Sequence, residues 1–187
     1  MPGTNWLAAT RSEAAADRIL DAAAELFTQK PAASVGMHEI AAAAGCSRAT
    51  LYRYFENREA LHTAFVHREA HAVHRQMVER LAGIADPAQR LIAGFLASLE
   101  LVRSSPALQS WFNAGDVPIG AEIAEQSDVI QAMVAAFVES LGAAGDPATV
   151  DRKARWLVRI LTSLLLFPGR DTADERAMIE EFLVPIL

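Results

Sequence analysis

The segment 45–61, GCSRATLYRYFENREAL, carries three arginines and two tyrosines within seventeen residues. Guanidinium and phenol groups donate hydrogen bonds to phosphate oxygens and to base edges, which are the contacts that hold a protein on nucleic acid. A short helix cannot bury so many cationic and polar groups, so one of its faces must stay in water or meet an anionic partner. This residue pattern suggests a helix that binds DNA.

The residues just before this segment provide the support that such a helix needs. Two short helices joined by a turn of about three or four residues, often with glycine, make a helix-turn-helix. The sequence predicts a first helix over 37–44 that ends at Gly45, and a second helix capped by Ser47. Leu51 and Phe55 stand four residues apart and would anchor the second helix inward. Its other faces then carry the candidate DNA contacts Arg48, Thr50, Tyr52, Arg53 and Tyr54.

Almost every other segment has the helical period, so the predicted fold class is all-α, with about nine helices and no strand. Thr10 with Glu13, and Thr172 with Glu175, have the spacing of capping boxes that open the first and last helices. A long helix is predicted over about 58–81. Two Asp-Pro pairs, at 86–87 and 146–147, mark the starts of two further helices.

Composition limits the class of protein. The chain has 187 residues, a net charge of −6 and one cysteine, Cys46, so an internal disulfide is excluded. Residues 1–80 hold nine basic and nine acidic residues, and the excess of acid lies in residues 81–187. No apolar run has the length of a membrane span, and the N-terminus lacks a signal-peptide pattern. We therefore expect a cytoplasmic protein with two regions that have different partners.

The stretch IAAAAGCSRATLYRYFENREAL resembles the signature of the TetR family of bacterial transcriptional regulators. The resemblance covers roughly residues 12–66, and the later helices agree with the family only in number and length. It implies a homodimer that binds palindromic operator DNA, usually as a repressor released by a small molecule. It also implies a flexible tail over 1–11, a DNA-binding domain over 12–57 and a ligand-binding and dimerisation domain over 58–187.

The resemblance assigns roles to single residues. Arg48 and Arg53 fall where the family reads bases, and Arg58 falls at a phosphate-contact position at the start of the long helix. Gly36 stands where a hydroxyl residue usually touches phosphate, so that only its backbone N–H could serve. The complete predicted DNA-binding set is Gly36, His38, Ser47, Arg48, Ala49, Thr50, Tyr52, Arg53, Tyr54 and Arg58.

A second group of candidate residues is His67, His71 and His74, which share one side of the long helix. Histidines four apart can bind a metal, but no cysteine or acidic pair completes a set in the sequence. Hydrogen-bonded or solvated histidines are the expected state, with no metal and no cofactor. The alternative function is a helical metal- or small-molecule-binding protein without DNA binding. No nucleophile–base pair or phosphate loop is recognisable, so we do not expect an enzyme.

Effector binding and dimerisation are predicted for the C-terminal helices. Apolar and aromatic side chains there suit a pocket as well as a core, and the family analogy favours a pocket for an uncharged or amphipathic apolar ligand. Its predicted lining is His71, His74, Phe95, Leu99, Arg103, Trp111, Phe112, Met133 and Phe137. The helix after Asp146 is apolar on nearly all sides, which favours cover by a second copy. The predicted dimer interface is Leu157, Leu161, Leu164, Leu165, Met178 and Phe182.

Overall fold

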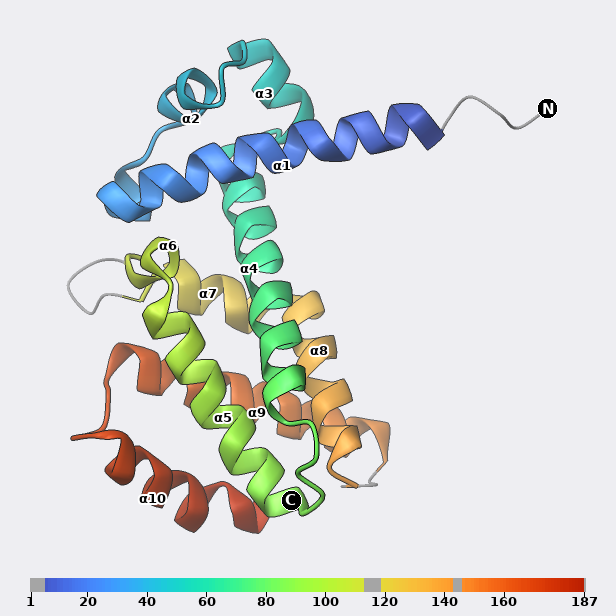
Figure 1. Cartoon of the computed structure of the whole chain (residues 1–187), viewed down its shortest axis with the longest axis vertical. Helices are drawn as coiled ribbons and strands as arrows, with labels where there is room; N and C mark the ends of the chain where they lie inside the picture. The colour runs from blue at the N-terminus through green and yellow to red at the C-terminus, as the bar shows by residue number, and fades with distance from the viewer. Residues whose placement is uncertain (1–5, 113–118, 143–145, 187) are drawn as a thin grey trace. The chain divides into compact units, whose positions relative to one another are not determined.

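The computed structural model describes residues 6–112, 119–142 and 146–186, and within them it contains α-helices, two short 3-10 turns and no strand (Figure 1). The all-α prediction is confirmed, with ten α-helices in this part of the chain. The N-terminal four are α1 (Trp6–Gln29), α2 (Met37–Ala43), α3 (Arg48–Tyr54) and α4 (Arg58–Arg80). The others are α5 (Pro87–Ser104), α6 (Pro106–Gln109), α7 (Ile119–Gln126), α8 (Asp128–Ser140), α9 (Pro147–Leu166) and α10 (Thr172–Phe182).

The chain divides into two compact units, one that ends at Phe65 and one that begins at Val66, so that α4 contributes to both. The core of the first unit is built from one face of α1 and the start of α4. Phe27 of α1 is 1% exposed and its ring meets Phe65 edge-on, with 4.9 Å between ring centroids. His62 is buried against the same ring, and burial lowers its pKa to about 4, with a further contribution from nearby Arg58.

The first helix starts earlier than predicted. It begins at Trp6, ahead of the Thr10–Glu13 spacing, so residues 6–11 belong to a helix and not to a tail. The residues WLAAT contain neither glycine nor proline and have no strong preference against helix, which explains the extension. Residues 1–5 lie outside the described residues. The predicted stop holds, because α1 ends at Gln29 just before Pro31.

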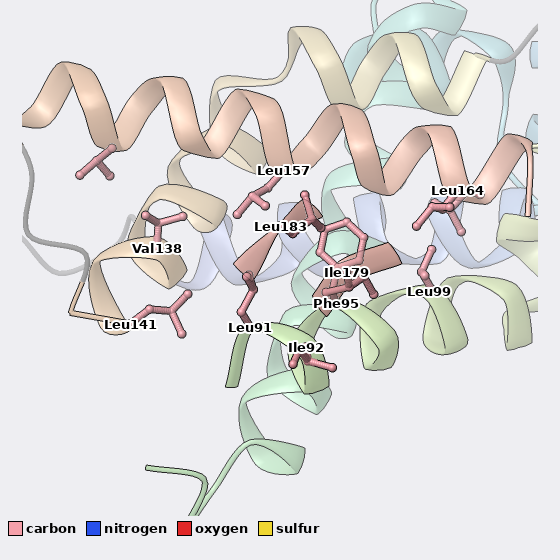
Figure 2. Close-up of a cluster of buried hydrophobic side chains, with 12 residues drawn as sticks. Leu91, Ile92, Phe95, Leu99, Val138, Leu141, Leu157, Leu164, Ile179 and Leu183 are labelled. Carbon is pink, nitrogen blue, oxygen red and sulfur yellow. The ribbon is translucent and has the colours of Figure 1, made fainter. Parts of the chain in front are cut away.

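The second unit packs α5, α8, α9 and α10 around a shared apolar core. Figure 2 shows Phe95 and Leu99 of α5 directed toward Leu164 of α9 and Ile179 of α10. The predicted helix starts are confirmed, since the carboxylates of Asp86 and Asp146 accept hydrogen bonds from the third residue of their helices. The sequence prediction missed α7, which has the sequence IGAEIAEQ. Its second residue is Gly120, and the residues before it have the composition of a loop, so the segment was not predicted as a helix.

A charged pair links α5 to α10 inside this unit. Both terminal nitrogens of Arg103 donate to Glu175, from Nη1 to Oε2 at 2.8 Å and from Nη2 to Oε1 at 2.7 Å. Nη2 also donates to the carbonyl of Leu164 at 2.8 Å, and the backbone N–H of Gly169 donates to Glu175 at 3.1 Å. The predicted Thr172–Glu175 capping box is therefore wrong: Asp171 caps α10, and Glu175, 2% exposed, is used for the pair.

The hydrogen bonds from Arg103 lower the pKa of Glu175, although burial acts in the opposite direction. A carboxyl group with a lowered folded-state pKa stabilises the fold above its ordinary value of 4.5, and that contribution is lost as the pH falls below it. At neutral pH Glu175 is therefore ionised, and its pair with Arg103 makes its full contribution to the stability of the contact between α10 and α5.

We expect Arg103→Leu to lower the free energy of unfolding by about 2 kcal/mol, because it leaves a buried carboxylate without its charged partner. Urea denaturation at neutral pH measures this. The double variant Arg103→Leu/Glu175→Leu should recover part of the loss, since no buried charge remains. Arg170→Leu is the control, because Arg170 pairs with Asp174 at the surface, where an ion pair contributes little to stability. If the loss of unfolding free energy in the double variant equalled the sum of the losses in the two single variants, coupling between Arg103 and Glu175 would be contradicted.

Candidate DNA-binding surface and effector cavity

A tight turn joins α2 to α3 and sets their relative orientation. Gly45 has φ +65°, a left-handed conformation that side chains disfavour, so the predicted glycine helix end is confirmed. The N–H of Cys46 donates to the carbonyl of Ala41 at 3.0 Å, which closes the end of α2. Ser47 then caps α3 by accepting from the N–H of Thr50 at 3.0 Å, as predicted.

The two faces of α3 differ sharply. Leu51 is completely buried and Phe55 is 7% exposed, so this pair fastens α3 to the first unit. Tyr52 is 41% exposed. The rest of the outward surface consists of exposed Ser47, Arg48, Ala49 and Arg53, with Thr50 and Tyr54 half-buried. The structure thus places seven of the ten predicted DNA-binding residues on α3 and its cap.

Neighbouring side chains on this surface order one another. The guanidinium of Arg53 lies over the ring of Tyr54, with 5.2 Å from Cζ to the ring centroid, which is a cation–π geometry. The hydroxyl groups of Ser47 and Thr50 lie 2.9 Å apart and share a hydrogen bond. Arg48 is exposed at the start of the helix and has no ion pair among the residues that the structure describes. Arg48 is therefore available for an external anion or base.

The three remaining predicted contacts lie outside α3. His38 is exposed on α2. Arg58 is exposed and donates from Nη1 to the carbonyl of Ala33 at 3.0 Å, which leaves its other nitrogens available. The N–H of Gly36 donates to Oε2 of Glu39 at 3.1 Å, so the donor that was predicted for phosphate is already engaged within the protein. Glu39 also pairs with Lys30, whose hydrogen bond lowers the pKa of this carboxyl.

The second unit contains a cavity of about 160 Å³. Its walls come from the part of α4 after Val66, from α5 to α9, and from Phe112, and they are almost entirely apolar. An apolar cavity of this size can take up a small hydrophobic molecule. The lining includes Val66, Ala70, Val73, His74 and Met77 of α4, Gly94 and Phe95 of α5, and Ile130, Met133 and Phe137 of α8.

Few polar groups reach this cavity, and most of them are satisfied within the protein. The hydroxyl of Ser98 donates to the carbonyl of Gly94 at 2.8 Å, and that of Thr162 donates to the carbonyl of Val158 at 3.0 Å. The carboxylate of Glu69 lies 3.6 Å from the guanidinium of Arg68. Its charge is compensated, so the walls offer little to a charged ligand.

Five predicted ligand residues, His74, Phe95, Phe112, Met133 and Phe137, line the cavity together. Four others do not line it. Leu99 and Trp111 are each 1% exposed within the packed core, and His71 is exposed on α4. Arg103 does not line the cavity either, because its guanidinium is bonded to Glu175.

Sequence reasoning missed the main wall of the cavity. Val66, Ala70, Val73 and Met77 recur at the helical period on α4 and face the cavity as one stripe. This spacing is visible in the sequence, but the sequence prediction assigned a binding role only to the histidines of the same helix. The leucines of α9 were also missed as cavity residues, because their apolar stripe was assigned to the dimer interface.

The histidines of α4 are separated by the structure. His67 Nε2 lies 2.7 Å from the hydroxyl of Ser127, the cap of α8, while His71 is exposed and His74 lines the cavity. Burial lowers the pKa of His67, and the proximity of His71 lowers it further, so a neutral ring is favoured at this hydrogen bond. In the described ranges, no three His, Cys, Asp or Glu side chains converge in a metal-binding group.

The outer surface of the second unit carries large apolar side chains on α9 and α10. Trp156 is 48% exposed, Phe167 69%, Met178 39% and Phe182 62%. We call these four residues the outer apolar surface. Met178 and Phe182 were predicted for a dimer interface and are available for one.

The predicted α9 part of that interface is wrong. Leu157 and Leu164 are each 5% exposed and Leu165 is 8% exposed, and Leu161 lines the cavity. The physical reason is that α9 is apolar on two sides, and the leucine side is covered within the same unit by α5, α8 and α10. The side with Trp156 and Phe167 is the one that remains uncovered.

No helix in the described part of the chain has both the length and the apolar character to cross a bilayer. Residues 19–65 match the family model for bacterial regulatory proteins of the tetR family. The whole chain is 60% identical, over 187 residues and 92% of the relative, to the HTH-type transcriptional regulator Rv1255c of Mycobacterium tuberculosis strain H37Rv.

Solved structures show the same fold. The TetR family repressor AlkX from Dietzia sp. strain DQ12-45-1b, implicated in biodegradation of n-alkanes, aligns with a TM-score of 0.68 at 20% identity, over 90% of this chain and 92% of that one. Thermus thermophilus FadR, a TetR family repressor in complex with lauroyl-CoA, aligns with a TM-score of 0.64 at 24% identity, over 91% and 93% of the two chains.

The family model coincides with the helix-turn-helix and the next helix, and the mycobacterial relative extends the match over the entire chain. The matched proteins are transcriptional regulators and not enzymes. The chain therefore belongs to the TetR family of helix-turn-helix transcriptional regulators.

Proposed function

We propose that this regulator is a repressor that binds a palindromic operator as a homodimer and leaves it when a small, uncharged, apolar molecule enters the cavity. The observation that carries the proposal is the presence in one chain of an outward arginine- and tyrosine-bearing face on α3 and an apolar cavity lined by α4. Helix α4 begins in the DNA-binding unit and ends in the cavity wall. We place the protein in the cytoplasm because its operator DNA is there.

The contacts to DNA are proposed to divide into two kinds. Arg48 lies at the start of the exposed face of α3, where a guanidinium can bridge two acceptors of guanine. Tyr52, Thr50, Tyr54 and Arg58 are proposed to donate to phosphates, which position the helix without reading sequence. Phosphate contacts release counterions, so affinity should fall steeply as salt is raised.

A homodimer is supported by the outer apolar surface. The exposed side chains of Trp156 on α9 and Phe182 on α10 are costly to leave in water, and residues of these types are enriched where proteins associate. A two-fold dimer would present two copies of α3 to a two-fold operator, at a separation of about one helical turn of DNA.

The effector is proposed to be uncharged because the cavity walls offer no unpaired charge. AlkX is implicated in n-alkane biodegradation, and the FadR structure contains lauroyl-CoA, so proteins of this fold are associated with apolar chains. This likeness supports an apolar effector by analogy of fold only. An effector that binds more tightly to one arrangement of α4 would then shift the population of protein molecules away from the DNA-bound state.

We expect Arg48→Ala to weaken operator binding by about 1–3 kcal/mol, roughly five- to 150-fold, and to relax the preference at one base pair of each half-site. Tyr52→Phe should weaken all sequences alike, because it removes a phosphate donor. Binding to an operator library measures both effects. Arg75→Ala, which removes an exposed cation of α4, is the control and should leave affinity and preference unchanged. An unaltered preference in Arg48→Ala would contradict its role in base recognition.

We expect Trp156→Glu and Phe182→Glu to shift the protein from a dimer to a monomer, because a charge would replace apolar surface that a second copy covers. Light scattering at micromolar concentration measures the mass, and operator binding should be lost together with the dimer. Val78→Glu changes another exposed apolar residue, on α4, and should leave the mass unchanged. A dimer that persists in both α9 and α10 variants would refute this interface.

We expect decanol to release the wild-type protein from its operator, whereas decanoate, of equal length but charged, should not, because its charge would lose solvation in an apolar cavity. Fluorescence anisotropy of labelled operator measures release. Ala70→Phe should fill the cavity and keep the protein on DNA in the presence of decanol. Gln76→Phe, an exposed position on the same helix, should respond like the wild type. Equal release of Ala70→Phe and the wild type would argue against this cavity as the effector site.

A further inference from the structure

We propose that two phenylalanine–glycine contacts close the two ends of the cavity, and that the distance between them sets the length of an unbranched aliphatic effector. The inference rests on the proposed role of the cavity as the effector site. It adds the shape of the ligand and the residues that determine its length.

Two side-chain contacts connect the helices that line the cavity. His67 of α4 meets Ser127 at the start of α8, and Met77, ten residues later on α4, meets Ser98 of α5. Figure 1 shows that α4 and α8 run in the same direction and that α5 runs in the opposite one. The cavity-lining part of α4, from Val66 to Met77, corresponds to roughly 16 Å of helix.

Phe137 closes the end of the cavity near Met77. It lies at the late end of α8, and its ring rests on the backbone of α5 at Gly94. A Cβ at Gly94 would lie 2.8 Å from Cζ of Phe137 and 3.3 Å from Cδ1 of Leu81. Only glycine leaves the ring in this position, so the contact fixes where this wall of the cavity stands.

Phe112 closes the opposite end in the same manner. It follows α6, near Val102 and Leu108, which lie late in and just after α5. A Cβ at Gly120 of α7 would lie 3.0 Å from Cζ of Phe112 and also 3.0 Å from Cβ of Trp111. The N–H of Gly120 donates to the carbonyl of Trp111 at 3.2 Å, which holds the start of α7 against this ring.

The volume and the length together define the ligand class. A compact apolar cavity of about 150 Å³ accommodates a single benzene ring. Here a cavity of about 160 Å³ is lined along roughly 16 Å of α4, which favours an elongated ligand over a compact one. A single aliphatic chain fits such a space, whereas a bulky ring system of equal carbon number does not.

The proposal is tested by binding alone, without DNA. Straight-chain primary alcohols from hexanol to hexadecanol are titrated into the wild-type chain by calorimetry. Affinity should rise about fourfold with each added methylene, the value expected for burial of one CH₂, and fall once the chain exceeds the distance between the two rings. Phe137→Leu and Phe112→Leu should each move the optimum to longer alcohols. Gly94→Ala should move it to shorter ones or lower the affinity at the wild-type optimum by at least fourfold.

Val129→Ala, an exposed position on α8 that does not line the cavity, is the matched control and should retain the wild-type optimum. Thermal denaturation verifies that each variant folds, and Phe137→Met replaces Phe137→Leu if that variant does not. An unchanged optimum in both phenylalanine variants, tighter binding of adamantanol than of decanol, or no binding of any alcohol would overturn the inference. Alcohols that bind with the expected length profile but do not release operator DNA would support it and refute the proposed repressor mechanism.

Discussion

The burial of Leu51 and Phe55 is the constraint on which the DNA-binding face depends. Leu51 lies on α3 and Phe55 directly follows the helix, and both side chains are buried in the first unit, so they fix the rotation of this helix about its own axis. With that rotation set, Arg48, Tyr52 and Arg53 can only point outward. The turn through Gly45 and the Ser47 cap fix where α3 starts. A helix of seven residues would not be stable alone, and its packing supplies the order that recognition requires.

The second unit combines a stable core with a cavity. Its stability comes from an apolar core that includes Phe95, Leu99 and Ile179, and from the pair between Arg103 and Glu175. Both lie in the part built by α5, α9 and α10. The cavity walls come from α4 to α9, and they share Phe95 of α5 and Leu157 and Leu165 of α9 with this core. Helix α9 is amphipathic, because its leucines face the core and the cavity whereas its outer side carries Trp156 beside the exposed charged residues Asp151, Arg155 and Arg159.

Much of the fold follows from local sequence signals. The helix ends at Gly45 and Pro31 and the caps at Ser47, Asp86 and Asp146 depend on single residues and their immediate neighbours, so they were predictable. The outward face of α3 was predictable for the same reason, since the spacing of Leu51 and Phe55 fixes which side is buried. The family was recognisable from this short region alone.

What depends on distant partners was not predictable. Glu175 has the spacing of a capping residue, but Arg103, seventy-two residues earlier, binds it instead. The leucines of α9 have the pattern of an interface, yet the covering helices come from the same unit. Phe137 and Gly94 are forty-three positions apart, and nothing in either segment indicates that the ring needs a glycine beneath it.

The central claim is that the outward side of α3 is built to lie against a DNA duplex. Selection of bound fragments from a pool of genomic DNA, with affinities then measured between about 50 and 200 mM salt, tests it most directly. We expect the protein to enrich palindromic sites, and its affinity for them to fall by orders of magnitude over this range while remaining well above that for bulk DNA. Retention of no fragment in preference to bulk DNA at low salt would contradict it.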